Sequence, residues 1–160
     1  MTDEQYWGLL DKAALRSKTN ERIIEFAKLL MEGYEKGYTI LEIAKNESTD
    51  SEYSSQLYAG DKENKALFCC TNLARAKKVL KAMIDSEKLP GSGAYSCVGE
   101  SCKELLDKLY YKKDIVALVF NPFLPNEITI PADIFLRPYI AELGKAVPPV
   151  GYEVENTDEQ

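Results

Sequence analysis

The chain has 160 residues, of which 45% are hydrophobic and 29% are charged, and these proportions are typical of globular proteins. Its length allows one domain with a full core and is too short for two. No apolar run approaches the roughly 18 residues of a membrane-spanning helix, and the polar, acidic start is unlike a secretory signal. We therefore expect a cytoplasmic protein without a membrane partner.

The formal net charge of −6 is concentrated near the C-terminus. Residues 151–160 contain four acids and no base, and the remaining chain carries 22 acids against 20 bases. This nearly balanced body favours neither a nucleic-acid groove nor an acidic mimic of DNA. The acidic tail is typical of a disordered, solubilising end, so we predict a single domain over residues 1–150.

Two helices are predicted at the N-terminus. Apolar residues recur at helical spacing from residue 3 to residue 16, and Asn20 is expected to cap a second, stronger helix. Gly33 is expected to weaken that helix and Gly37 to end it. Its apolar stripe consists of Ile23, Phe26, Ala27, Leu30, Met31 and Tyr34. We expect this helical segment, residues 1–37, to pack as a pair on a sheet formed within residues 38–150.

The sheet is predicted from short apolar runs. Residues 38–45 fit a strand or a helix, and we favour the strand. Two runs around a glycine-containing polar turn, 56–59 and 66–69, predict a hairpin. Residues 115–120 predict a strand buried on both faces, and residues 128–130 are expected to pair with it.

Further helices are expected between these strands. One begins at Thr71 or Asn72 and ends near Asp85, and another covers residues 101–113. Residues 46–55 read as a polar loop, and a last helix after Pro131 is shortened or kinked by Pro138. The predicted fold class is therefore α+β, with a small mixed sheet and about four helices.

Several of these segments resemble the SseB-like domain. They are A-L-F-C-C-T-N-L-A-R-A from residue 66, I-V-A-L-V-F-N-P-F from residue 115 and I-T-I-P-A-D-I from residue 128, and the resemblance spans residues 56–143. In that family one strand ends before a threonine-containing helix start and a second ends in asparagine-proline. The chain departs from it at Cys69-Cys70-Thr71, where Phe-Thr is usual, and in its N-terminal helices. The resemblance implies a bacterial cytosolic module without an established enzymatic activity and supplies no catalytic residue.

Chemistry based on histidine is excluded, because the chain contains none. No phosphate-binding glycine motif occurs, and adjacent Cys69 and Cys70 would point to opposite faces of a strand, which disfavours a four-cysteine zinc site. We predict no metal and no cofactor. Glu100 and Glu104, four residues apart, are interpreted as solvated acids on a helix, and Arg75 as part of a solvated helix face.

A candidate partner contact lies at Asn121, Pro122, Phe123 and Leu124. The favoured interpretation is that the segment only ends the strand and has no binding role. Asparagine suits turns, proline fixes φ, and Phe123 would pack on the core. As an exposed loop, the segment would offer Phe123 and Leu124 as anchors.

The preferred function is a non-catalytic protein-interaction module of accessory, regulatory or immunity type, with a protein as its partner. The alternative is a thiol-dependent enzyme that uses Cys97 or Cys102, because these residues lie in a stretch interpreted as a glycine-flanked loop.

Overall fold

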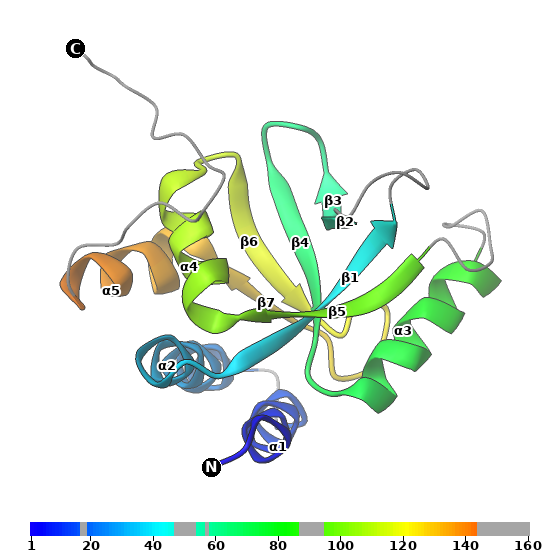
Figure 1. The fold of residues 1–160 in the computed structure, drawn as a ribbon, viewed down its shortest axis with the longest axis horizontal. Helices are drawn as coiled ribbons and strands as arrows, with labels where there is room; N and C mark the ends of the chain where they lie inside the picture. Colours follow the sequence, from blue (N-terminus) through cyan, green and yellow to red (C-terminus); the bar gives the residue numbers. More distant parts are fainter. Residues whose placement is uncertain (17–18, 47–53, 57, 87–94, 144–160) are drawn as a thin grey trace.

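The computed structural model describes residues 1–16, 19–46, 54–56, 58–86 and 95–143, which form a mixed sheet covered by helices on both faces (Figure 1). The helices are α1 (Asp3–Ala14), α2 (Asn20–Lys36), α3 (Leu73–Asp85), α4 (Cys102–Tyr111) and α5 (Arg137–Glu142), with a π-helical turn, η1 (Ala132–Leu136). The strands are β1 (Thr39–Asn46), β2 (Ser54–Gln56), β3 (Tyr58–Gly60), β4 (Lys65–Cys70), β5 (Tyr95–Ser101), β6 (Ile115–Phe120) and β7 (Ile128–Pro131). The predicted α+β class is confirmed, with five α-helices among the described residues rather than about four.

The sheet forks in its middle. β1 is paired with β5 along its length, whereas its pairing with β4 is limited to Leu41 opposite Cys70 and Glu42 opposite Cys69. Beyond that point β1 pairs with β2 and β4 pairs with β3. On the other side of β4 lie β6, which is parallel to it, and then antiparallel β7. The fork leaves a gap in the sheet next to the acidic residue Glu42.

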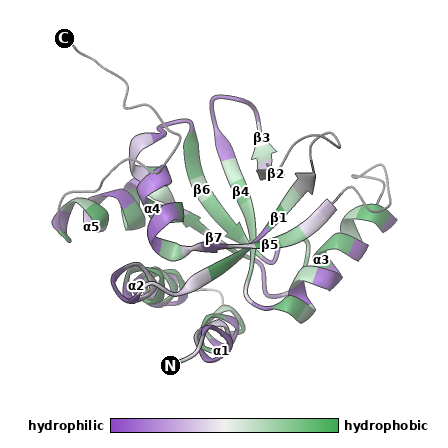
Figure 2. Cartoon of the chain, in the orientation of Figure 1, coloured by the Kyte–Doolittle hydropathy of each residue, from purple (hydrophilic) through white to green (hydrophobic). Residues whose placement is uncertain are grey.

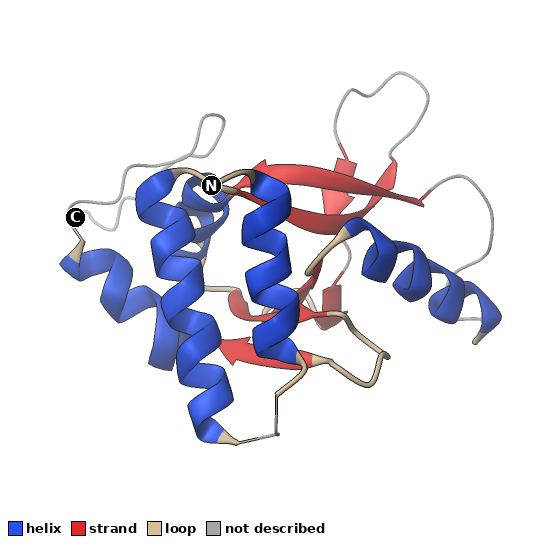
Figure 3. Cartoon of the chain, turned by 90° about the horizontal axis from the view of Figure 1, so that it is seen from below, coloured by secondary structure: helices blue, strands red, loops and turns tan. Residues whose placement is uncertain are grey.

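The N-terminal helices α1 and α2 lie side by side against the sheet, as expected (Figure 3). Thr2 caps α1 in a reciprocal hydrogen-bonded capping box with Gln5, and Thr19, rather than Asn20, caps α2. The Phe26 ring of α2 packs on that of Phe120 in β6, with 4.7 Å between the ring centroids. The apolar stripe of α2 therefore meets the centre of the sheet.

Glycine has a packing role in α2. The helix continues through Gly33 and ends at Gly37, as predicted, where the backbone adopts the left-handed conformation with φ 77°. A Cβ atom on Gly33 would lie 2.3 Å from the Tyr6 hydroxyl oxygen. That hydroxyl donates a hydrogen bond to the carbonyl of Leu29 at 2.7 Å. The absence of a side chain at Gly33 thus brings α1 and α2 together.

The two faces of the sheet carry separate apolar clusters. Leu67 and Cys69 face α2 and α4, whereas Phe68 and Cys70 join the cluster beneath α3. This confirms that the adjacent cysteines point to opposite faces of β4. Figure 2 shows β6 as a hydrophobic strand in the middle of the molecule, and five of its six residues are buried, as expected for a strand covered on both sides.

Other expectations need correction or stay open. The stretch around Cys97, interpreted as a glycine-flanked loop, forms strand β5, because a half-exposed edge strand tolerates polar and small residues. Residues 38–45 do form a strand, and Thr39 to Asn46 are its bounds. The predicted polar loop at 46–55 is wrong at its ends, where Asn46 belongs to β1 and Ser54 and Ser55 to β2. Its middle, 47–53, and the acidic tail at 151–160 lie outside the described residues.

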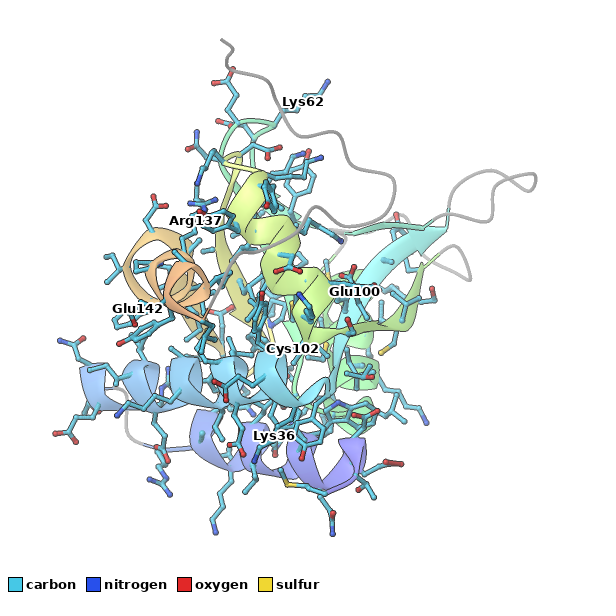
Figure 4. The ribbon with its side chains drawn as sticks, turned by 60° about the vertical axis from the view of Figure 1, so that its left-hand side comes forward. Lys36, Lys62, Glu100, Cys102, Arg137 and Glu142 are labelled. Atoms are coloured by element: carbon cyan, nitrogen blue, oxygen red, sulfur yellow. The ribbon has the colours of Figure 1, made fainter. Side chains whose placement is uncertain are left out.

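Pro138 does not interrupt a helix, because one helical segment ends just before it and another begins there. η1 follows the N-cap residue Pro131, and α5 then begins with Pro138 in its first turn, where a missing N–H is tolerated. The Arg137 guanidinium donates to the carbonyls of Leu109 at 2.9 Å and Lys112 at 3.0 Å, which fixes α5 to the end of α4 (Figure 4). No helix in the described ranges has both the length and the apolarity to cross a membrane.

Candidate functional site

The segment predicted to contact a partner follows directly from the only parallel strand pair among the described residues. β4 and β6 end at the same edge of the sheet, and the Asn121 N–H donates to the Cys69 carbonyl at 2.8 Å. In sheets with parallel strands, the edge beyond their carboxyl ends is where binding residues commonly lie. The chain places Thr71 after β4 and Asn121 after β6, so these two side chains meet there.

Thr71 and Asn121 are buried and hydrogen-bonded to each other. The Thr71 N–H donates to Asn121 Oδ1 at 3.0 Å, and Asn121 Nδ2 donates to Thr71 Oγ1 at 2.9 Å. The Thr71 hydroxyl in turn donates to Asp11 Oδ1 of α1 at 2.5 Å. The ends of both strands are thereby fixed to the first helix.

Asp11 is the centre of this network. Its carboxylate also accepts from Arg75 Nε at 3.1 Å and from Asn126 Nδ2 at 3.2 Å. Burial alone would raise the pKa of Asp11, but hydrogen bonds from Arg75 and Thr71 outweigh it and hold that pKa below its usual value. The sequence suggested that Arg75 belongs to a solvated helix face, and this interpretation is wrong. Arg75 pairs with a negatively charged Asp11.

The loop of residues 121–127 is held at several points. Its turns are closed by N–H groups of Leu124 and Glu127, which donate to the carbonyls of Asn121 at 3.2 Å and Leu124 at 3.0 Å. The Phe123 N–H donates to Glu127 Oε2 at 3.0 Å, and the Arg22 guanidinium of α2 donates to the Glu127 carbonyl at 3.1 Å. These bonds define one conformation for the loop.

Phe123 has an unusual backbone in this loop. Its φ is 69°, and that of Asn121 is 56°, both in the left-handed region. Asparagine enters this region readily, but a bulky residue does so rarely. Phe123 nevertheless stays 46% exposed and meets Phe68 edge-on, with 6.0 Å between the ring centroids. The favoured expectation that Phe123 packs into the core is thus not what the structure shows.

The other three residues of the predicted contact are less exposed than Phe123. Asn121 and Pro122 are buried, and Leu124 is half-buried against the cluster under α3. Phe123 is therefore the most solvent-exposed of these four residues. Sequence reasoning missed Asp11 and Asn126 as supports, because their pairing spans 115 positions in the chain.

The two cysteines of the alternative function lie in a different part of the molecule. Cys97 is a half-buried residue of β5, and Cys102, the first residue of α4, is fully buried between α4 and α2 (Figure 4). Burial raises the pKa of Cys97, and it raises that of Cys102 to about 12. Both shifts oppose formation of the reactive thiolate. The described residues contain no group of three or more potential ligands able to hold a metal ion.

Comparison with protein families, with curated proteins and with solved structures finds no match for this chain.

Proposed function

We propose that this protein is a non-catalytic interaction module that binds a protein partner through the loop of residues 121–127. The observation that carries the proposal is Phe123, an exposed aromatic ring on a left-handed backbone. Such a conformation costs about 1–3 kcal/mol and persists only where surrounding structure enforces it. Almost half of the residue nevertheless faces solvent, where a partner can reach the ring.

The loop has the properties of a preorganised contact. A partner that immobilises a hydrogen-bonded loop loses little conformational entropy in doing so. Aromatic anchors that enter an apolar pocket supply much of the affinity of protein interfaces. Phe123 has this role in the proposal, and the exposed neighbours Pro125 and Glu127 form its rim. The partner is accordingly a folded protein with an apolar pocket sized for one phenyl ring.

We also propose that the chain is an SseB-like domain. What supports this is the position of the residues on which the resemblance rests. Thr71 and Asn121, which follow the two characteristic strands, are joined by hydrogen bonds at one edge of the sheet.

The proposal is tested by photo-crosslinking from position 123. A benzophenone amino acid replaces Phe123 in one variant and Tyr139 in another, because Tyr139 is an aromatic residue of similar exposure, 43% against 46%, on α5. Cell extract of the source organism is irradiated with each variant, and the adducts are identified by mass spectrometry. We expect a protein adduct that position 123 gives and position 139 does not.

The captured protein is then purified and titrated with the unlabelled chain. Phe123→Ser is expected to weaken its binding by about 30-fold or more, the effect of losing an interface anchor, and Tyr139→Ser to leave it unchanged. Equal adducts from both positions, or equal affinities for wild type and Phe123→Ser, would refute the role of the loop.

A further inference from the structure

The fork in the sheet leaves a cavity on the face that α4 covers. Its volume is about 680 Å³, within the range of roughly 300–1,000 Å³ that small-molecule sites occupy. The diverging strands β1 and β4 supply its floor, and β5 and α4 supply one wall. This cavity lies away from the loop of residues 121–127, and none of the four residues predicted to contact a partner lines it.

Glu42 of β1 lies on the floor of this cavity. Its sequence position already sets it apart, because it is the one acid in the apolar run from Ile40 to Ala44. Only 2% of the residue is exposed, and no hydrogen-bond donor in the described part of the chain reaches its Oε2 atom. A buried carboxylate oxygen without a donor is costly unless a ligand or a proton satisfies it.

A second carboxyl group faces Glu42 across the strand pair. In the β1–β5 register Glu42 is opposite Val98 and Ile40 is opposite Glu100, so Glu42 and Glu100 are diagonal neighbours on one face. Glu100 is thus not a solvated helix acid, as expected from sequence, but a wall of the cavity beside α4 (Figure 4). The site therefore places two acids side by side.

One lysine of α4 balances only part of this charge. Lys108 Nζ lies 3.1 Å and 3.0 Å from the two oxygens of Glu100, and its side chain is only 11% exposed. Nearer the opening, Lys65 pairs with Asp114 at 3.0 Å. These two pairs are internally neutral, so the carboxylate of Glu42 adds a negative charge at the floor.

We propose that this cavity binds a small aliphatic amine, whose ammonium group donates hydrogen bonds to the carboxylates of Glu42 and Glu100. An ammonium group has three donors and matches a site with two adjacent carboxylates. The aliphatic lining supplied by Ala44, Leu67, Val98 and Ile115 contacts the carbon chain. The amine adds a second positive charge beside Glu42, next to that of Lys108, which is paired with Glu100.

The electrostatics of the floor agree with this assignment. Burial raises the pKa of Glu42 well above its ordinary value, the neighbouring Glu100 raises it further, and Lys108 lowers it. Burial is the main cause of the raised pKa of Cys69 and of Cys97, and the nearby Glu42 raises both further. An ammonium group bound beside Glu42 would favour its carboxylate form and so lower this raised pKa.

The test is a titration of the isotopically labelled protein with putrescine and with n-butylamine, followed by amide chemical shifts in NMR. We expect saturable binding with a dissociation constant on the order of 1 mM or lower, and shift changes at Glu42, Glu100 and Lys108. Two solutes serve as controls: n-butanol, which has the same carbon chain without a charge, and sodium chloride at equal ionic strength. Neither is expected to produce these changes.

Two variants separate the charge of Glu42 from general effects. Glu42→Gln keeps the shape and removes the charge, and we expect it to weaken amine binding at least tenfold. Asp85→Asn, at an exposed acid of α3, should bind the amines like wild type. Phe123→Ser should also bind them normally, because the cavity does not depend on the loop.

No saturable binding by the wild-type protein, or binding of n-butanol equal to that of n-butylamine, would overturn the proposal. Unchanged amine affinity in Glu42→Gln would overturn it too. Glu42 and Glu100 would then be only a buried carboxyl pair that shares a proton.

Discussion

Thr71 and Asn121, 50 positions apart in the chain, are joined by two hydrogen bonds at the ends of the parallel strands β4 and β6: the Thr71 N–H donates to Asn121 Oδ1, and Asn121 Nδ2 donates to Thr71 Oγ1. The pair joins the two strands at their carboxyl ends, and Asp11 joins the pair to α1. The geometry of the proposed binding loop, which starts at Asn121, therefore depends on a threonine in another strand connection.

Loss of the Thr71 hydroxyl should destabilise the fold. Thr71→Val leaves Asn121 Nδ2 without its acceptor and removes one donor from Asp11, so we expect a loss of about 2 kcal/mol in the free energy of unfolding. Urea denaturation measures it. Thr129→Val, at an exposed threonine of β7, is the control and should change stability by less than about 0.5 kcal/mol. Equal effects of the two substitutions would contradict the structural role of the network.

The left-handed backbone of Phe123 predicts a reversed order of stability for two small substitutions. Phe123→Gly should be more stable than Phe123→Ala by about 0.5–1 kcal/mol, because glycine adopts φ 69° without steric cost. At the neighbouring Leu124, which has no positive φ, alanine should be the more stable of the two. Thermal and urea denaturation of the four variants measure these differences in stability. The same order at both positions would show that Phe123 is not strained.

Packing of α2 on the sheet predicts a large cost for Phe26→Ala. The side chain is fully buried and contacts Phe120, so its truncation should cost about 3–5 kcal/mol. Ile24→Ala on the same helix removes a side chain that is 40% exposed and should cost much less. A loss below about 1 kcal/mol for Phe26→Ala in denaturant melts would mean that α2 is not part of the core.

Glu42 should make stability depend on pH. Its folded pKa is raised above the ordinary value of 4.5, so its contribution to stability is present below that value and is lost as pH rises through the folded pKa. Relative to Glu42→Gln, which cannot titrate, we expect the wild-type protein to lose stability as pH rises from 4.5 through the raised folded pKa of Glu42. Urea melts at several pH values measure the difference. Parallel pH profiles of the two proteins would show that Glu42 does not hold a proton in the fold.

Thiol reactivity distinguishes the proposed function from the thiol-enzyme alternative. Burial raises the pKa of both Cys97 and Cys102, so each should react with a chromogenic disulfide more slowly than a free thiol at neutral pH. Cys102, which is fully buried, should react only after unfolding. Cys97→Ser and Cys102→Ser assign the signals. If a cysteine of the native protein reacts faster than a free thiol, the result would favour the thiol-enzyme alternative.

The parts of the fold with strong apolar periodicity could be predicted from sequence. The stripe containing Phe26 identified α2, and the uninterrupted run at residues 115–120 identified β6. β5 could not be found in this way, because its residues are half-exposed and include Gly99 and two serines, a composition shared with loops. Tertiary pairing with β1, rather than local propensity, makes this segment a strand.

The two candidate sites also differ in how far they could be predicted from the sequence. Residues 121–124 were identified because an asparagine-proline pair after an apolar run marks an exposed strand end. The pair of Glu42 and Glu100 required the β1–β5 register, which no local pattern specifies. A signal for Glu42 was present, however: an acid within an apolar strand segment is unusual enough to indicate a buried polar site.

The contact between Phe26 and Phe120 also has a consequence for biosynthesis. Phe120 follows Phe26 by 94 residues, and at about 5–20 residues per second the ribosome needs on the order of 5–20 s to supply it. During that interval the Phe26 ring lacks the strand on which it packs, although β1 and β4 of the same sheet are already made. Slower translation of the codons between these two residues would prolong the exposure of that part of α2 in the nascent chain.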